Sequence, residues 1–366
     1  MSDQRGETAI AAEPAASISC YTSEIPPFVK TELERLYSHL FSSLPFFETF
    51  RTTENVCTYV VMRDGQPSTI LLFQNKGRRI DVLNEMIRID EQELRCFVDY
   101  VFANFSPVAV ISFKAIQSDV QRLPFPYQRH NSKEDFVIVL PDTQGEYRAR
   151  IGSSTRYNVK RYMKRLNRDF PTFSYRFYEN EEISEQDIRE IIRLSEIRIS
   201  AKKKRFGIDE KEVKQILNLA RICGLVNVVS IDGHLCAGTI TLRTGSSYLA
   251  MVNAHEPKYD GYWLGTLCYY LTICESIARG GKRFHMGGGR YDYKIRLLGV
   301  RQDMDHLEVY RSYGHALVNC DNVVKTIFSS LVRRTKVWLL DRETSPISQF
   351  VLRTLFLFRM LTRCTK

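Results

Sequence analysis

The pattern of apolar and polar residues predicts a small α/β unit in the first half of the chain. Two apolar runs within residues 57–74 flank Asp64-Gly65, a pair that tolerates positive φ and favours a tight hairpin. A third strand, RRIDVLN, follows, and apolar residues then recur at helical spacing over 91–105. The apolar run 108–113 predicts a buried strand after this helix.

The second half repeats this order of elements at a larger scale. A second hairpin is predicted to turn at Asp232-Gly233, and it is followed by a helix over 264–279. The other elements predicted here are strands at 136–141, 282–287 and 306–312 and helices at 154–168, 184–200 and 209–223. The shared order indicates that one α/β fold is duplicated.

Length and composition fit two globular domains. The chain has 366 residues, of which 44% are hydrophobic and 26% charged, and a chain of this length suits two cores. We expect a disordered tail at 1–25, an N-terminal domain at 26–134, a C-terminal domain at 135–319 and a basic amphipathic helical tail at 320–366.

Charge and cysteine content narrow the class of protein. The formal charge of +10 favours anionic partners. The nine cysteines form no CxxC pair and mostly lie in apolar stretches, which is typical of reduced thiols in a cytoplasmic protein. No Cys/His cluster has zinc-ligand spacing, so no metal is predicted. The N-terminus lacks the pattern of a secretory signal, and no apolar run is long enough to span a membrane.

The C-terminal tail is rich in Phe and Leu, with Arg353, Arg359 and Arg363 interspersed. This pattern is equally consistent with a helix that packs on the body or on a second subunit and with a helix that lies on an anionic membrane. The protein is therefore expected in the cytoplasm, with peripheral attachment to the inner face of the membrane as the alternative.

Two glycine-containing segments in the second half are candidates for chemistry. Gly261 and Gly265 lie at the head of a predicted helix, where backbone N–H groups and the helix dipole favour a phosphate. Gly287 to Gly289 follow a short strand, and Tyr293 and Lys294 then open a short helix with side chains able to bind an oxyanion or an anion. The alternative is that both segments are simple turns.

These segments together resemble a known family. STRYNVKRYMKRL (154–166), the second hairpin, the strand-loop-helix at 248–279 and MGGGRYDYK resemble the CelD-type acetyltransferase domain of the GNAT superfamily, which is related to FemAB-like twin-GNAT proteins. The resemblance covers about 135–315. It implies an α/β (α+β) fold of two GNAT-like domains, each a mixed central sheet flanked by helices.

The resemblance implies an N-acyltransferase that moves an acyl group from acyl-CoA to an amine on an anionic small molecule, such as a nucleotide-sugar, polysaccharide or lipid precursor. The catalytic candidates are Lys294, Tyr293, His285 and Glu256, with His255 as a further base. The residues expected to bind the cofactor are Met251, Val252, Asn253, Gly261, Leu264, Gly265 and Thr266. The residues expected to bind the substrate are Arg156, Asn158, Arg161, Gly287, Gly289 and Arg290.

Two departures from the family pattern leave other functions open. His285 stands where the family usually carries an aspartate, and Arg290 stands where an acid usually follows the glycines. The alternatives are a FemAB-like transferase that uses aminoacyl-tRNA, a non-catalytic GNAT-like scaffold and a peripheral membrane-binding module. Nucleic acid is otherwise not favoured as a partner, since no base-stacking aromatic platform is visible.

Overall fold

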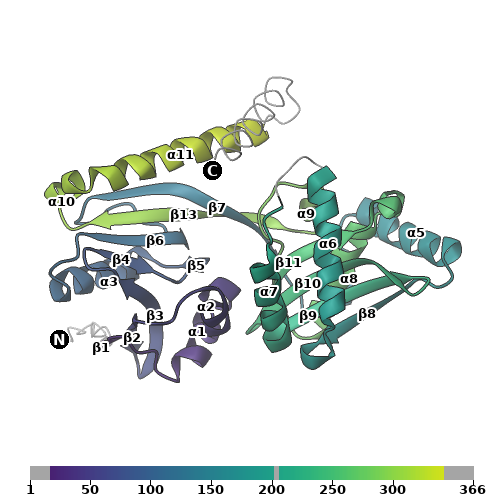
Figure 1. Ribbon diagram of the computed structural model, residues 1–366, viewed down its shortest axis with the longest axis horizontal. Helices are drawn as coiled ribbons and strands as arrows, with labels where there is room; N and C mark the ends of the chain where they lie inside the picture. Colours follow the sequence, from purple (N-terminus) through teal and green to yellow (C-terminus); the bar gives the residue numbers. More distant parts are fainter. Residues whose placement is uncertain (1–16, 202–205, 342–366) are drawn as a thin grey trace, which may run out of the picture.

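The computed structural model describes residues 17–201 and 206–341 (Figure 1). Of the predicted disordered tail, residues 1–16 lie outside the described part. Ser17–Tyr21 form strand β1, which pairs with β2 (Val56–Arg63), so the prediction of disorder is wrong for this segment. A strand at the edge of a sheet is stabilised by main-chain pairing, which composition does not reveal.

The first half of the chain forms one lobe, on the left in Figure 1. The Asp64-Gly65 hairpin forms as predicted, with φ of 50° and 75°. Helix α3 (Glu91–Asn104) begins with a capping box between Asp90 and Glu93. The other elements of this lobe are α1 (Val29–Tyr37), η1 (Leu40–Ser42), α2 (Leu44–Phe50), β3 (Gln66–Asn75), β4 (Arg79–Val82), β5 (Ile87–Arg88) and β6 (Val110–Gln117).

The second lobe repeats the order of hairpin, strand, helix and parallel strand. The Asp232-Gly233 turn has φ of 53° and 77°. Strand β11 (Ser247–His255), helix α8 (Leu264–Ala278) and the parallel strand β12 (Arg283–His285) correspond to β4, α3 and β6 of the first lobe. The remaining elements are α4 (Gln144–Arg150), α5 (Ser153–Asp169), β8 (Ser174–Glu179), η2 (Asn180–Glu182), α6 (Glu185–Ala201), α7 (Glu210–Cys223), β9 (Gly224–Ile231), β10 (His234–Thr244), η3 (Pro257–Tyr262) and α9 (Asp292–Arg296).

Two long strands join the lobes into one mixed sheet. The strand order is β1-β2-β3-β4-β6-β13-β7-β12-β11-β10-β9-β8, with β5 on β6. Strand β7 (Tyr127–Val139) pairs with β12 of the second lobe, whereas β13 (Val300–Tyr310) pairs with β6 of the first. The two strands also pair with each other from Tyr127–Val309 to Val137–Val300, and Figure 1 shows them running between the lobes. The predicted boundary at residue 135 therefore falls inside a shared strand.

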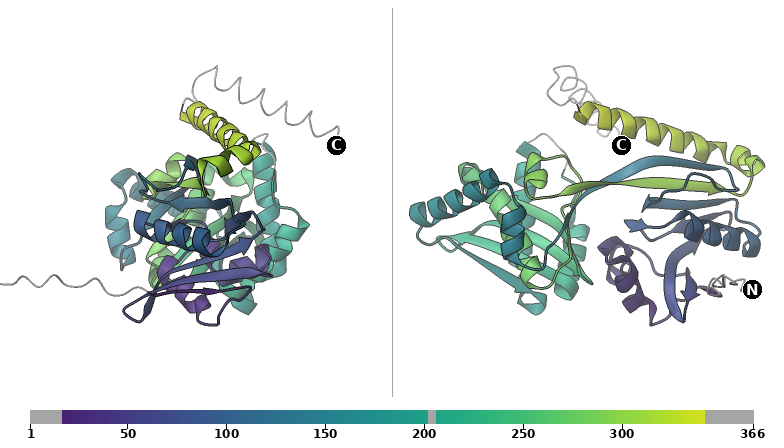
Figure 2. Two further views of the ribbon diagram at one scale, coloured as in Figure 1. Left: turned by 90° about the vertical axis from the view of Figure 1, so that its left-hand side faces the viewer. Right: turned by 180° about the vertical axis from the view of Figure 1, so that it is seen from behind.

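Helices cover both faces of each half-sheet. In the first lobe α3 covers one face, and in the second lobe α8 and α5 pack against one face. A third core contains residues of α1, α2, α6 and α7 together with residues of both half-sheets. This core lies between the lobes, as the two views in Figure 2 and the contact of α2 with α7 show. The mixed α/β fold that the sequence predicts is confirmed.

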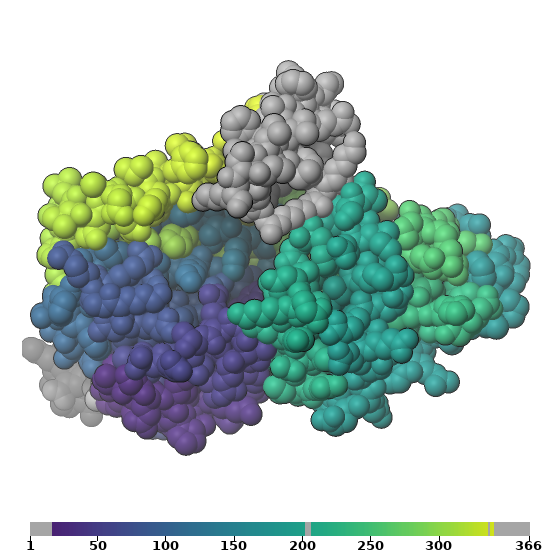
Figure 3. Space-filling model, in the orientation of Figure 1, coloured from purple at the N-terminus to yellow at the C-terminus, as the bar shows by residue number. Residues whose placement is uncertain are grey.

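The chain then forms α10 (Tyr313–Val318) and α11 (Cys320–Asp341). Helix α11 lies along β7 and β13 in Figure 1 and forms the yellow-green ridge at the upper left of Figure 3. Only the first part of the predicted helical tail is therefore seen, because residues 342–366 lie outside the described part. Within 17–201 and 206–341, no helix combines the length and apolarity needed to cross a bilayer.

Candidate functional site

The second lobe contains a fork between two parallel strands. Strand β12 pairs with β11 only as far as His285 opposite Leu249, although β11 continues to His255. On its other side, the ladder of β11 with β10 steps from Ala250 to Val252, which leaves Met251 as a bulge. The fork thus leaves one edge of β11 without a strand partner in the described part of the chain.

His285 lies at the base of this fork and pairs with Asp135 of β7. The Nδ1 atom of His285 lies 2.7 Å from Oδ2 of Asp135, and both side chains are buried. Because a carboxylate only accepts hydrogen bonds, the imidazole donates through Nδ1 and keeps its lone pair on Nε2. This Nε2 is buried and has no hydrogen-bond partner within the described residues. The arrangement is that of a base held by a carboxylate.

The first lobe contributes His39 to the same place. Its ring lies edge-to-face against the His285 ring, with centroids 4.6 Å apart. Nδ1 of His39 accepts a hydrogen bond from the Phe41 backbone N–H, so Nε2 carries the proton. Burial, followed by the neighbouring His285 and then by the charges of Arg283 and Lys133, holds the pKa of His39 well below its usual range. His39 is therefore a neutral, buried donor beside a buried acceptor.

His39, Asp135 and His285 also have candidate metal-ligand atoms within 4.8 Å of one another, and no second such group occurs among the described residues. The hydrogen bonds fit a metal poorly. Nδ1 of His285 is bonded to Asp135, and Nε2 of His39 is protonated because its Nδ1 accepts from a backbone N–H. The donor set therefore fits proton transfer better than metal ligation.

The glycine loop after β12 is held by Lys294. Its ammonium donates to the carbonyl oxygens of Met286, Gly287 and Gly288 at 2.9, 2.7 and 2.7 Å, and the side chain is 2% exposed. Burial lowers the pKa of Lys294 to about 8, although the carboxylates of Asp135 and Glu134 act in the opposite direction. Since all three N–H groups are used, the geometry favours a loop-holding role for Lys294 over direct contact with substrate.

Glu134 holds the same loop from β7. Its Oε2 accepts a hydrogen bond from Arg290 Nε at 3.1 Å. It also lies 3.6 Å from Arg301 and 3.7 Å from Arg333 of α11. Gly287 and Gly289 have φ of 69° and 94°, a region that favours glycine. The predicted substrate residues Gly287, Gly289 and Arg290 thus lie together, in a loop fixed on both sides.

The first turn of α8 lies against the far end of β11. Asn253 donates to the Gly265 carbonyl at 3.0 Å and accepts from Thr239 at 2.7 Å, which fixes the helix to the strand. A Cβ on Gly265 would lie 2.7 Å from Nδ1 of His255, so this position needs glycine. The predicted cofactor residues at 251–253 and 264–266 are therefore adjacent across the open side of the fork.

The basic helix α5 borders this turn. Arg165 donates to the Gly261 carbonyl at 3.3 Å, and the Tyr162 ring lies 5.7 Å from that of Trp263. Arg161 lies 4.5 Å from the Tyr162 ring centroid and is exposed. The positive charge of Arg161 thus lies near the N-terminus of α8, where an anion is favoured.

Two predicted substrate residues on α5 lie differently. Arg156 donates to the carbonyls of Arg148, Ala149 and Ile151, so it caps α4. Asn158 is half-buried on the same helix. The structure therefore gives Arg156 a structural contact in place of a free guanidinium.

Two predicted catalytic residues do not join His285. Glu256 pairs with Lys258 at 2.9 Å and lies seven residues beyond Leu249 along the chain, which places it roughly 20 Å from His285. Tyr293 stacks on Tyr269, with ring centroids 5.4 Å apart, and burial raises the pKa of its hydroxyl. Glu256 and His285 therefore do not share one site.

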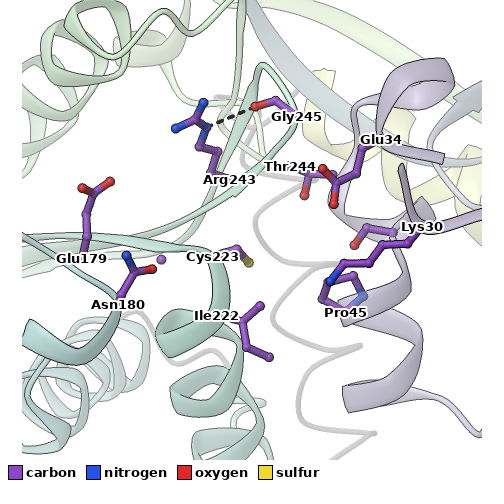
Figure 4. Close-up of a pocket in the computed structure, with 12 residues that line it drawn as sticks. Lys30, Glu34, Pro45, Glu179, Asn180, Ile222, Cys223, Arg243, Thr244 and Gly245 are labelled. Carbon is purple, nitrogen blue, oxygen red and sulfur yellow. Dashed lines mark hydrogen bonds between the residues drawn. The ribbon is translucent and has the colours of Figure 1, made fainter. Parts of the chain in front are cut away.

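A cleft opens between the lobes, where α1 faces the second lobe. It has a volume of about 510 Å³, and Lys30 and Glu34 of α1 face Arg243 and Glu179 of the second lobe across it (Figure 4). Gly245, with φ of 55°, borders this cleft, and a Cβ there would lie 2.7 Å from Ser38 Oγ. Ser38, which this contact places beside the edge of the cleft, precedes the buried His39 in the chain.

The comparison with known families decides the class of the second lobe. Residues 153–295 match the sequence profile described as Acetyltransferase (GNAT) domain. The protein is a transferase with a GNAT-type acyltransferase domain. This matched segment contains the fork, the glycine loop and α8, so the acyltransferase domain includes every predicted site residue.

Three solved structures are similar to this chain. The crystal structure of FemX is 11% identical, with a TM-score of 0.59, and the match covers 81% of this chain and 99% of FemX. A conserved protein of unknown function from Bacteroides thetaiotaomicron is 11% identical over 79% of this chain and 99% of its own, with a TM-score of 0.49. L-PGS from Bacillus licheniformis is 12% identical over 85% and 98%, with a TM-score of 0.48. No curated protein matches by sequence.

Sequence reasoning missed two residues of the candidate site, Asp135 and His39. Asp135 lies at the polar end of an apolar run, and His39 follows a short helix. The sequence contained one signal for this pair, the histidine at position 285 in place of the family's aspartate. A buried histidine at that position needs a hydrogen-bond partner that an aspartate would not need. Only the pairing of β12 with β7 identifies that partner as Asp135.

Proposed function

We propose that the protein is an N-acyltransferase that moves an acyl group from acyl-CoA to a primary amine on a small anionic acceptor. The observation that carries this proposal is the unpartnered Nε2 of His285 at the base of the β11–β12 fork. A group that removes a proton is needed where the amine meets the thioester, and this nitrogen is a base with no other bond to make.

In the proposed reaction the acceptor nitrogen attacks the thioester carbonyl and the carbon–sulfur bond breaks. His285 Nε2 takes the proton that the amine loses and then gives it to the departing thiolate, which leaves as a thiol and returns His285 to its starting state. Asp135 holds His285 in the required tautomer. The bulge at Met251 turns backbone toward the open edge of β11, where a backbone N–H would stabilise the oxyanion.

Placement of the two substrates follows from the charges around the fork. The α8 N-terminus and the exposed Arg161 and Arg165 support the pyrophosphate of the donor on one side. The cleft between the lobes, where Lys30 and Arg243 are accompanied by Glu34 and Glu179, is the proposed entry for the acceptor on the other side. The resemblance to the CelD type is itself a prediction, and so is the polysaccharide or lipid precursor that it favours as the acceptor.

Isothermal titration of the full chain with acetyl-CoA tests the donor. We expect saturable heat that desulfo-CoA competes away and that Arg165→Ala weakens, whereas Arg168→Ala, an exposed neighbour beyond the contact with Gly261, leaves it unchanged. If the titration shows no binding of acetyl-CoA, the proposal of a CoA-dependent enzyme is wrong.

A second assay separates the alternative donor. Radiolabelled aminoacyl-tRNA is offered with a mixture of amine acceptors, because the fold is shared with FemX and α5 is basic. Transfer of the label without any binding of CoA would favour the aminoacyl-tRNA mechanism. If the protein neither binds CoA nor transfers the label, the result would favour the non-catalytic scaffold.

A further inference from the structure

Helix α11 packs on the sheet through its polar side. Asn322 contacts the buried Glu308 of β13, and Thr326 is 7% exposed. Arg333 donates to Asn131 of β7 at 2.9 Å and approaches Glu134. These three residues follow one face of the helix, so polar contacts anchor it to the protein.

The opposite side of α11 is apolar and faces outward. Val324, Phe328 and Leu331 are 61%, 66% and 54% exposed, and their spacing of three and four residues places them on one stripe. The outer face, as we call it, consists of Val324, Ile327, Phe328, Leu331 and Trp338. Helices of water-soluble proteins normally bury such a stripe, so this helix is inverted relative to the usual arrangement.

Helix α10 extends the outer face. Leu317 and Val318 are 76% and 71% exposed, and Tyr313 is 79% exposed. Exposed apolar side chains gathered on two successive helices mark a contact with another apolar body.

The charges that flank the outer face are mainly basic. Lys325 and Arg334 are exposed, and helical geometry places them on its two sides. Asp321 pairs with Lys325 at 3.1 Å. In the amino-acid sequence, Arg342, Arg353, Arg359, Arg363 and Lys366 follow with Glu343 as the one acid, although these positions lie outside the described residues.

We propose that the outer face of α10 and α11 lies on an anionic lipid surface. An apolar stripe that inserts among acyl chains, with cations at the level of the headgroups, is the pattern of a helix that binds in the plane of a membrane. Each basic side chain near such a surface adds attraction to anionic lipid. Two copies of this chain stacked by the same face would instead bring their basic flanks together.

The attachment would hold the acyltransferase domain at the membrane. Arg333 anchors α11 to Glu134, which also holds Arg290 of the glycine loop. The site therefore has a fixed position relative to the outer face. An acceptor that carries a lipid would reach the site without leaving the membrane.

Vesicle flotation with the full-length chain tests the proposal. We expect the protein to float with vesicles that contain phosphatidylglycerol and much less with pure phosphatidylcholine. Phe328→Glu and Leu331→Glu should each reduce flotation about tenfold or more, because a charge replaces an exposed apolar side chain that inserts among the acyl chains. Ser329→Glu adds the same charge at an exposed position away from the stripe and should retain flotation and the same unfolding temperature.

Tryptophan fluorescence gives an independent readout. The chain has only two tryptophans, and Trp338 lies on the outer face. Its emission should shift to the blue with anionic vesicles, and Trp338→Phe should abolish the shift while flotation persists. Equal flotation on both vesicle types, or flotation unchanged in both glutamate variants, would overturn the proposal. A dimer that Phe328→Glu converts to a monomer, with flotation unaffected, would assign the face to a second copy instead.

Discussion

His285 Nδ1 and Asp135 Oδ2 lie 2.7 Å apart, although 150 residues separate them in the chain. The register of β12 on β7 creates this contact, since His285 pairs with Val137 and Asp135 lies two residues along the same face. The pair fixes which nitrogen of the imidazole is free.

Replacing His285 with Gln should lower kcat by about 10²–10⁴-fold, because the acceptor amine loses its base. The affinity for acetyl-CoA, measured by titration, should stay unchanged. His234→Gln, at the exposed first residue of β10, is the matched control and should retain full activity. Equal kcat in the two variants would remove His285 from the mechanism.

Replacing Asp135 with Asn should reduce kcat by about 10²–10⁴-fold with little change in KM, because an amide can donate to Nδ1 and so move the proton to Nε2. The ¹⁵N chemical shifts of His285 should report this change of tautomer. Asp142→Asn, at an exposed position past the end of β7, is the control. A variant that loses activity with the tautomer unchanged would show that Asp135 only supports the fold.

Activity should fall as the pH rises through about 8, where the buried Lys294 loses its proton. A neutral amine has two N–H groups for three carbonyls, so the glycine loop loses a hydrogen bond. Lys294→Met should be less active at pH 7 and should lack this alkaline limb, whereas Lys282→Met, at an exposed position, should keep it. The same limb in Lys294→Met would contradict the assignment.

The stability contribution of Lys294 should have the opposite pH dependence. Its pKa is lowered on folding from the usual value of about 10.4, so between about pH 8 and 10 the unfolded chain binds more protons than the folded one. The free energy of unfolding should therefore rise with pH in this window, relative to Lys294→Met. Urea unfolding at several pH values measures the difference.

Replacing Glu308 with Gln should destabilise the fold by about 2–4 kcal/mol at neutral pH. Burial alone would raise the pKa of Glu308, but hydrogen bonds from His306 and Arg79 lower it to about 2. Its contribution is therefore complete above about pH 4.3 and is lost as the pH falls toward 2. The exposed Glu146→Gln should cost less than about 0.5 kcal/mol. A difference that persists at pH 2 would contradict the ion-pair explanation.

Much of the fold could be predicted from local pattern. The helices at 91–104, 153–169 and 185–201 were predicted within about two residues because their apolar spacing is regular. Both Asp-Gly turns formed as predicted, since that pair adopts positive φ at little cost.

Polar strands could not be predicted. Residues 127–135, YQRHNSKED, show no apolar alternation, yet they form most of β7 because neighbouring strands and the polar side of α11 satisfy them. The arrangement of the site could not be predicted for a related reason. Sequence indicated His285 and Lys294 as polar groups near glycines, but only tertiary pairing shows that one has a free nitrogen and the other is fully bonded.

The exchange of β7 and β13 makes the two lobes mechanically inseparable. A cut anywhere within 127–139 removes a strand from both half-sheets at once, so neither lobe is expected to survive expression by itself. Heating should accordingly give a single cooperative calorimetric peak. The cleft must then open for substrates by rearrangement of loops, because a rigid-body hinge motion of the lobes would break the hydrogen bonds between β7 and β13.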